Sequence, residues 1–279
     1  MSDHAVIIPV HNRRDTTLAC LRHLLATGDL GRCRVIVVDD GSDDGTSEAV
    51  GAEFPEVEIQ RGDGTLWWTG AIALGMQRAS AAGVDAICWL NDDCLPAPGT
   101  LDALFAETYV EPGQVVAPAC YNADTGEPVP NAFAGRRRIS ATPAAKQRAE
   151  GLSGFCVALP RAVWTRIGLP DAGRFPHYYG DNAYTLSAAR AGFPVMVLGS
   201  ARADLTAFHT PPTLRAIGER ARGARERWAR VFVSPKSPYR LRTLLAFQRL
   251  KYGWILGSII AGVRGASWIA RTVWAGIRS

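Results

Sequence analysis

The chain has 279 residues and a mass of 30.0 kDa, which suits one large domain, or one domain with an appendage. Hydrophobic residues make up 47% and charged residues 20%, which excludes a disordered, collagenous or coiled-coil chain. Residues 1–212 contain 17 Lys and Arg against 24 Asp and Glu, whereas residues 213–279 contain 14 against 2. An acidic body therefore carries a strongly basic tail, for which we expect an anionic surface as partner.

The six cysteines form no CxxC pair and no zinc-like spacing, so we expect a reducing compartment and no structural zinc. The N-terminus lacks a basic segment followed by a long apolar one, as a secretory signal would have. The longest apolar stretch near the C-terminus, residues 253–263, ends at Arg264 and is too short to span a bilayer. We expect a protein that is made and kept in the cytosol.

The N-terminal part predicts an α/β fold. Residues 5–10 and 34–38 are apolar, β-branched runs typical of strands buried on both faces of a parallel sheet. Between them, residues 16–27 have leucines at helical spacing, and Gly28 and Gly31 are expected to end that helix. Strand, helix and strand within about 35 residues make a βαβ unit.

Further elements follow in chain order. We expect a helix from Thr46, a helix over residues 70–82 and a helix over residues 182–191. Strands are expected at residues 57–60, 85–90 and 151–159. Residues 121–150 are rich in Pro, Gly, Ala and Arg and predict a mobile loop. From Thr213 the pattern is helical and basic, with a break at residues 234–238.

Two groups of carboxylates come directly after predicted strands, where open α/β sheets bind ligands. Asp39 and Asp40 suit a base N–H or a ribose hydroxyl, although a turn that caps the next helix explains them equally well. Asn91, Asp92 and Asp93 offer hard oxygen ligands for Mg²⁺ or Mn²⁺, which can clamp a diphosphate. A polar cap between strand and loop is the alternative for this second group.

Four further residues each have a structural and a chemical interpretation. Asp181 falls near the start of a predicted helix, where it either caps the helix or acts as a general base. His209 is a lone histidine, which is more often structural than a ligand. Trp67 and Trp68 are either core anchors or the wall of a sugar or base pocket. The dinucleotide-binding glycine spacing is absent around them.

Taken in order, the motifs AVIIPVHN, VVDDGSDDGT, a Gly/Trp loop, WLNDDCLP, GLSGF and GDxxY followed by RAGF resemble the family-2 inverting glycosyltransferases of GT-A fold. Within that family, the chain looks most like bacterial rhamnosyltransferase-type enzymes that build O-antigen and cell-wall polysaccharides. The resemblance covers about residues 4–212. It implies a GT-A catalytic domain over residues 1–212, with nucleotide-sugar binding in about 1–120 and the acceptor part in about 121–212. The fold implied is α/β, with a mixed, mostly parallel sheet flanked by helices.

The resemblance also implies roles for matching residues. A nucleoside pocket is expected from Pro9, Val10, Asn12, Asp39 and Asp40. The DxD-type motif falls on Asn91, Asp92 and Asp93, with Asp93 as metal ligand and Asp92 as ribose or metal contact; His209 matches a histidine that completes the metal or diphosphate site. Asp181 matches the general base, and the loop beside the donor sugar falls on Trp67, Trp68 and Gly70.

Three positions depart from the family pattern. Gly180 replaces the usual Glu, Ala183 stands where an acidic residue is common, and Ser187 stands where an Arg is common. None of them removes the expected base, so they bear on acceptor identity more than on activity. A catalytically silent nucleotide-sugar-binding subunit of a polysaccharide assembly complex is the alternative function. A sugar nucleotidyltransferase is disfavoured, because PVHNRRD after the first strand contains no glycine for a phosphate loop.

The basic tail, residues 213–279, predicts amphipathic helices that lie on an anionic membrane leaflet. Arg264, Arg271 and Arg278 are seven residues apart and share one side of a helix, and Trp254, Trp268 and Trp274 add apolar surface. We expect a peripheral protein on the inner face of the plasma membrane, with no nucleic-acid partner. Nucleic-acid binding is the competing interpretation of the charge, and a homo-oligomer interface is a further alternative. The expected substrates are dTDP-rhamnose or a UDP-sugar and a glycan acceptor linked to polyprenyl diphosphate.

Overall fold

The computed structural model describes residues 3–140, 145–207, 211–219 and 221–277. Its strands are β1 (His4–Val10), β2 (Arg34–Asp39), β3 (Glu58–Arg61), β4 (Ala86–Leu90), β5 (Cys94–Pro96), β6 (Val115–Asn122), β7 (Pro128–Val129), β8 (Ala132–Ala134), β9 (Arg137–Ile139), β10 (Lys146–Ala149), β11 (Gly151–Leu152), β12 (Cys156–Pro160) and β13 (Val195–Leu205). Its helices are α1 (Arg14–Ala26), α2 (Asp29–Arg32), α3 (Thr46–Glu53), α4 (Trp67–Ala81), α5 (Thr100–Thr108), α6 (Arg161–Ile167), α7 (Gly180–Arg190), α8 (Leu214–Gly218), α9 (Ala224–Trp228), the π-helical turn η1 (Ala229–Val233), α10 (Leu241–Tyr252) and α11 (Trp254–Ile277).

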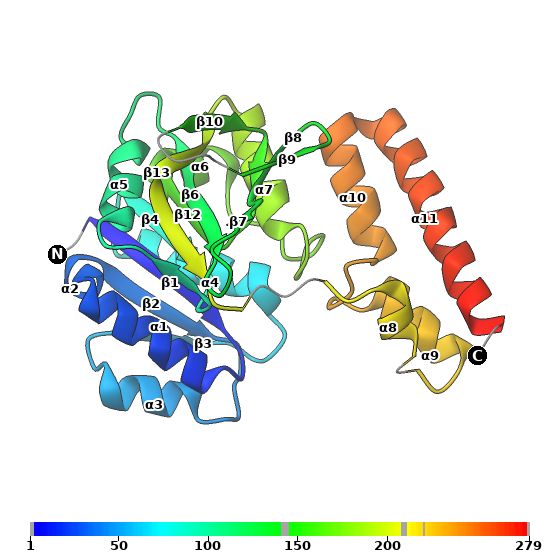
Figure 1. Ribbon diagram of the computed structural model, residues 1–279, viewed down its shortest axis with the longest axis horizontal. Coiled ribbons are helices and arrows are strands. Elements are labelled where there is room, and N and C mark those ends of the chain that lie inside the picture. The colour runs from blue at the N-terminus through cyan, green and yellow to red at the C-terminus, as the bar shows by residue number, and fades with distance from the viewer. Residues whose placement is uncertain (1–2, 141–144, 208–210, 220, 278–279) are drawn as a thin grey trace.

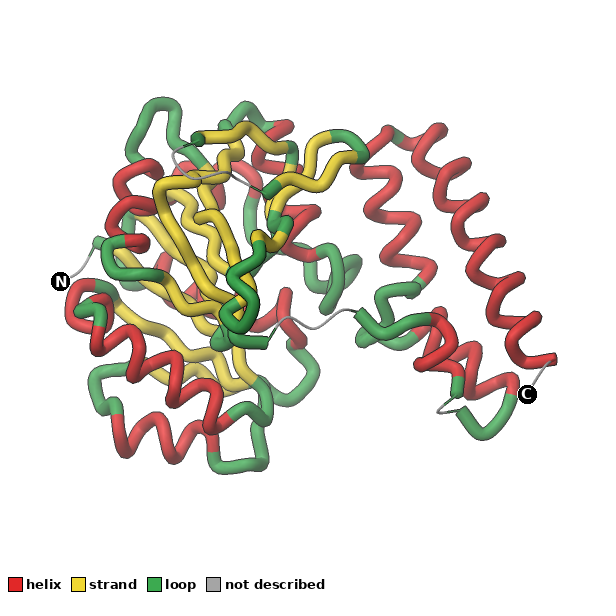
Figure 2. Tube along the Cα trace, viewed as in Figure 1, coloured by secondary structure: helices red, strands yellow, loops and turns green. Residues whose placement is uncertain are grey.

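A mixed sheet, yellow in Figure 2, forms the centre of the body that precedes the C-terminal extension. Its strands follow the order β10-β13-β6-β12-β4-β1-β2-β3. The four strands at one end, β4, β1, β2 and β3, pair in parallel, and β12 runs antiparallel between β4 and β6. The predicted strands at residues 5–10, 34–38, 57–60 and 85–90 are confirmed, within a residue or so at each end. The continuous apolar runs form strands here because helices cover both faces of the sheet.

The alternation of side chains along β1 shows the two faces. Val6, Ile8 and Val10 pack with leucines of α1 and α5, whereas Ala5 and Ile7 pack with α4, α6 and α7. Figure 1 shows α1, α2 and α3 together beside β1–β3. The result is a three-layer α/β domain, in which helices α1 and α4 follow directly after the loops that leave the sheet.

Three details of the predicted elements are wrong. Residues 121–150 contain β7, β8, β9 and β10 rather than one loop; these strands have two to four residues, too few to show a period of two, and only the turn residues mark them. Asn122 Oδ1 accepts the backbone N–H groups of Asp124 and Thr125 in the first of these turns. Residues 151–159 divide between β11 and β12, which belong to different sheets. Gly31 lies within α2, whereas Gly28 (φ +78°) ends α1 as expected.

The described residues of the C-terminal extension, 213–219 and 221–277, are mainly helical, and the predicted break at residues 234–238 lies between η1 and α10. Figure 1 shows α10 and α11 side by side, away from the sheet. A Cβ at Gly257 would lie 2.3 Å from the backbone oxygen of Gln248, so glycine is what permits this close approach. Phe247 of α10 packs in a cluster with Phe133, Phe175 and residues of α7, which joins the extension to the body. Within the described ranges, none of the helices combines the length and hydropathy needed to cross a membrane.

Candidate active site

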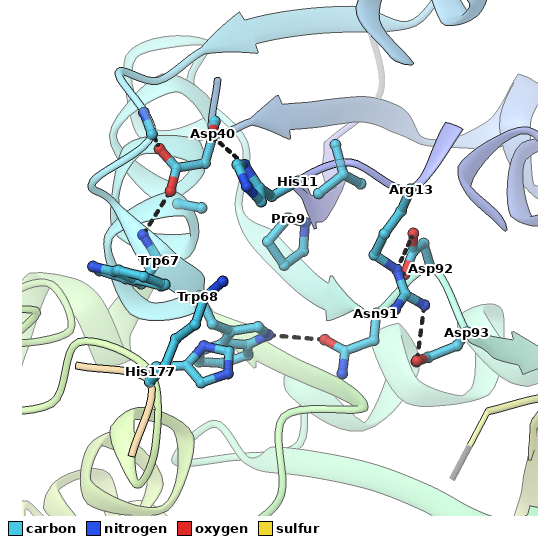
Figure 3. Close-up of a pocket in the computed structure, with 14 residues that line it drawn as sticks. Pro9, His11, Arg13, Asp40, Trp67, Trp68, Asn91, Asp92, Asp93 and His177 are labelled. Carbon is cyan, nitrogen blue, oxygen red and sulfur yellow. Dashed lines mark hydrogen bonds and ion pairs between the residues drawn. The ribbon is translucent and has the colours of Figure 1, made fainter. Parts of the chain in front are cut away.

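The carboxyl ends of β1, β2 and β4 meet at one edge of the sheet, and a cavity of about 380 Å³ opens there (Figure 3). Figure 3 shows Arg13, Asp92 and Asp93 on one wall, Trp67, Trp68 and His177 on the opposite one, and Asn91 between them. The residues that line the cavity are Pro9, Val10, His11, Arg13, Asp40, Gly64, Trp67, Trp68, Ala71, Asn91, Asp92, Asp93, His177 and Lys236. Eight of the residues predicted from sequence are thus brought together.

Arg13 bridges the two carboxylates that follow β4. Its Nε lies 2.8 Å from Asp92 Oδ1, and its Nη2 donates to Asp93 Oδ2 at 3.0 Å. Asp92 also accepts a hydrogen bond from Thr17 Oγ1, and its side chain is only 4% exposed. Burial raises the pKa of the Asp92 carboxyl above its usual range despite the opposing effect of Arg13. Asp92 is therefore a buried anchor of this wall, and Asp93 is the more accessible carboxylate.

The Trp67–Trp68 loop is fixed by Asp40. Asp40 Oδ1 accepts the N–H groups of Gly64 (2.9 Å) and Leu66 (3.1 Å), and Oδ2 accepts that of Trp67 (2.8 Å). Trp67 has a left-handed backbone (φ +56°), which costs free energy in a residue with a side chain, so the carboxylate holds a strained turn. Trp68 Nε1 in turn donates to Asn91 Oδ1 at 2.8 Å, which orients the amide toward the cavity.

Four predicted site residues are not among those that line the cavity. Asn12 joins two loops, since its N–H donates to Ser42 Oγ and its Oδ1 accepts from Asp43 N, both at 2.8 Å. Asp39 accepts hydrogen bonds from Ser42 N and Ser47 Oγ. Gly70 is buried in α4. The fourth, Asp181, packs against Gly154. His209 lies outside the described residues.

Asp181 lies one side chain away from the cavity. A Cβ at Gly154 would lie 2.4 Å from Trp68 Cζ2 and 3.0 Å from Asp181 Cβ, so both side chains pack against Gly154. Asp181 Oδ2 accepts from Gly154 N and Oδ1 from Asn182 N, both at 2.7 Å. Burial raises the pKa of the Asp181 carboxyl, and these backbone donors only partly offset that effect. Such a carboxylate is suited to accepting a proton.

The structure explains one of the departures from the family pattern. A Cβ at Gly180 would lie 2.0 Å from Thr69 Oγ1 and 3.0 Å from Thr69 Cβ. The space beside Asp181 in which a Glu side chain would start is therefore filled by Thr69, which is fully buried.

Sequence reasoning missed several cavity residues, above all Arg13, His177 and Lys236. Arg13 adjoins the predicted Asn12, but nothing in the sequence pairs it with residues about 80 positions later. His177 lies in the same motif as Asp181; burial, with Lys236 nearby, lowers the pKa of its imidazole to about 4, so the ring is neutral at pH 7. Lys236 comes from the break between η1 and α10, and its neighbours in sequence give no sign that it returns to the sheet.

The donor set fits a divalent cation only in part. Within the described residues, no three His, Cys, Asp or Glu side chains gather into a metal site. Asp93 lines the cavity, and its Oδ1 accepts no hydrogen bond from the described side chains. Mg²⁺ is commonly held by one or two carboxylates together with substrate phosphates. The residues therefore fit a cation that shares its ligands with a bound diphosphate.

Solved structures identify the architecture. The chain superposes on GalNAc-T7 in complex with UDP, GalNAc and Mn²⁺ (TM-score 0.61, 15% identity, 88% of this chain and 50% of that one). It also superposes on the mannosyltransferase PcManGT from Pyrobaculum calidifontis with GDP-Man and Mn²⁺ (0.55, 16%, 96% and 75%). A third match is S. aureus TarS 1–349 (0.54, 16%, 73% and 60%). The chain thus spans half of GalNAc-T7, and its fold is the GT-A fold of glycosyltransferases.

The sequence places the chain within that class. Residues 5–159 match the model of the family described as glycosyl transferase family 2, which is more than half of the chain. The chain belongs to glycosyl transferase family 2. No curated protein sequence matches it significantly.

Proposed function

We propose that the protein transfers a sugar from a nucleoside-diphosphate donor to a hydroxyl group of a glycan, with inversion at the anomeric carbon. The observation that carries this proposal is the arrangement at the sheet edge. Asn91, Asp93 and Trp68 line one cavity, the Trp68 indole donates to Asn91, and Asp181 packs with Trp68 against Gly154. The candidate donor site and the candidate proton acceptor thus share Gly154 and Trp68 as neighbouring residues.

In this proposal the nucleoside lies against Pro9, Val10 and the turn that Asp40 holds, and the diphosphate lies beside Asp93. Mg²⁺ or Mn²⁺ bound by Asp93, with Asp92 close by, would neutralise charge on the departing nucleoside diphosphate. The two solved relatives with nucleotides, bound to UDP or GDP-Man, also contain Mn²⁺. At 15% and 16% identity, the likeness to these two structures supports the fold alone. The use of a metal by this protein is therefore part of the proposal.

Asp181 is the proposed general base. It takes the proton from the acceptor hydroxyl, whose oxygen attacks the anomeric carbon opposite the diphosphate in one displacement. Burial raises the pKa of this carboxyl, which makes its ionised form a stronger base. The donor is proposed to be dTDP-rhamnose or a UDP-sugar, and the acceptor a polyprenyl-diphosphate-linked glycan of a bacterial surface polysaccharide, since the motifs resemble rhamnosyltransferase-type enzymes.

Calorimetric titration with nucleoside diphosphates and their sugars, in Mn²⁺ or Mg²⁺, tests the donor half. We expect one nucleotide to bind in a metal-dependent way, and Asp93→Ala to weaken that binding by about tenfold or more, because a carboxylate ligand of the shared cation is lost. Asp204→Ala, an aspartate on β13 in a surface ion pair with Arg202, serves as control. Absence of nucleotide binding to the wild type would contradict the proposal and favour the silent subunit.

We also propose that α11 lies on an anionic membrane surface, which would place the enzyme at the inner leaflet beside its lipid-linked acceptor. One side of α11 packs on α10 at Gly257 and Gly265, whereas the other exposes apolar side chains, among them Ile255 (76%), Ile259 (58%) and Val263 (68%). No Asp or Glu follows Glu226, while ten Lys and Arg do. An apolar face flanked only by cations matches the surface of anionic lipids better than that of a second copy with the same charge.

Co-sedimentation of the full chain with phosphatidylglycerol-containing vesicles tests the membrane proposal. The double variant Ile259→Glu, Val263→Glu is expected to lose most of its vesicle-bound fraction, because it places two charges on the exposed face without disturbing the core. Leu25→Glu, which changes an exposed leucine of α1 (57%), is expected to sediment like the wild type. Equal binding of all three proteins would exclude α11 as the membrane contact.

A further inference from the structure

One cation of the cavity comes from the C-terminal extension. Lys236 belongs to the segment between η1 and α10, yet it lines the cavity together with residues of β1, α4 and the end of β4. Its Nζ lies 5.0 Å from the centroid of the Trp67 ring, on the wall that also contains His177. The extension thus contributes a residue to the site at the sheet edge.

No carboxylate in the described part of the chain forms an ion pair with Lys236. The other cation of the cavity, Arg13, is bound to Asp92 and Asp93, and the Asp40 carboxylate accepts three backbone N–H groups. Among the described residues, Lys236 makes no ion pair, and its neighbours on this wall are an indole and a neutral imidazole. Lys236 is exposed at the cavity, and a cation there with no carboxylate paired to it attracts an anionic ligand.

The position of Lys236 is fixed by the segment that carries it. Ser237 is 2% exposed; its Oγ donates to the backbone oxygen of Val231 and accepts from Tyr239 N at 3.1 Å. Pro235 and Pro238 restrict the backbone on both sides. Further along, Thr243 Oγ1 donates to the backbone oxygen of Arg174 at 3.0 Å, which ties α10 to the body next to His177. Lys236 is therefore presented by a folded turn.

We propose that Lys236 binds the diphosphate of the donor, so that the C-terminal extension completes the donor site. This inference rests on the proposed function, because the phosphates are the anionic groups of a nucleotide donor whose sugar is neutral. A lysine supplies a compact charge with three N–H donors, which suits phosphate oxygens. The Asp93 wall and Lys236 then contact the diphosphate from different elements of the chain.

Calorimetric titration of the whole chain tests the role of Lys236. The ligand is the nucleoside diphosphate that binds the wild type in the titrations proposed for the donor site. Lys236→Ala is expected to weaken binding of the nucleoside diphosphate by about tenfold and to leave binding of the phosphate-free nucleoside unchanged. Lys236→Arg, which keeps the charge, is expected to bind within a few-fold of the wild type. Lys146→Ala, which changes an exposed lysine on β10 paired with Glu107, is the matched control.

The outcomes separate this inference from the proposed function. If the wild type binds the nucleoside diphosphate and Lys236→Ala binds it equally well, the role of Lys236 is overturned while the donor site stands. If Lys236→Ala weakens the nucleoside and its diphosphate alike, Lys236 shapes the site without contacting phosphate, and the inference is again wrong. If the wild type binds no nucleoside diphosphate, the proposed function fails, and the inference fails with it.

Discussion

Asp181→Asn is expected to abolish sugar transfer while preserving donor binding. The amide cannot take a proton from the acceptor hydroxyl, and general-base catalysis contributes about a hundred- to ten-thousandfold to rates. The substitution is nearly isosteric, and one amide oxygen can still accept from Gly154 N or Asn182 N, which Asp181 now binds. Trp68 and Gly154 should therefore keep their packing, so that the loss falls on the chemical step.

The measurement pairs a transfer assay with nucleotide titration, and Asp204→Asn serves as the control. The pH profile provides a second readout. Asp181 is active as a base only when ionised, and burial raises its pKa above the ordinary value of 3.8, so the rate is expected to fall as the pH drops through that raised pKa. The acidic limb of the pH–rate profile is thus expected at a higher pH than the titration of an exposed aspartate. Near-normal rates in Asp181→Asn would exclude this residue as the base.

Arg13→Ala is expected to destabilise the folded state by about 3 kcal/mol, because it leaves the Asp92 carboxylate buried without its cation. This loss is at the lower end of the range for breaking a buried ion pair, because the Arg13 side chain is itself 31% exposed. Asp92 would retain only the hydrogen bond from Thr17. The effect is measurable as a lower urea midpoint with an unchanged slope.

The double variant Arg13→Ala, Asp92→Asn distinguishes charge from packing. Removing the orphaned charge should restore much of the lost free energy of unfolding, which a double-mutant cycle would report as a coupling between the two sites. Arg14→Ala, which breaks an exposed pair with Asp15, is expected to change stability by less than about 1 kcal/mol. If Arg13→Ala were as stable as Arg14→Ala, Asp92 would not depend on Arg13.

The parallel part of the sheet could be predicted because its strands are long, apolar and bounded by turn residues. The runs at β1, β2 and β4 place Val10, Asp40 and Asn91 at strand ends, and the direction of the strands brings these ends to one edge. The short strands β7 to β10 could not be predicted, because a strand of two to four residues gains its stability from its partners and shows no periodicity of its own.

The position of a site residue could be predicted where a motif directly follows a strand, as at Asp93, which lines the cavity; its role as a metal ligand stays a proposal. It was not predictable where two distant segments meet. The pairing of Arg13 with Asp92, and the return of Lys236 to the cavity, depend on tertiary packing that local patterns do not encode. Asp40 shows a third case: the carboxylate lies where expected but binds backbone N–H groups of the tryptophan loop.

Thr69 fills the space next to Gly180, so a side chain at 180 requires a change at 69. Introducing at 180 the glutamate usual in the family would drive its Cβ into Thr69, whose own backbone N–H donates to the oxygen of Pro176. A smaller residue at 69 would have to come first, at the expense of a cavity in the core. Substituting Gly180 alone by glutamate is therefore expected to destabilise the fold, whereas a variant that also has a smaller residue at 69 is expected to tolerate it better.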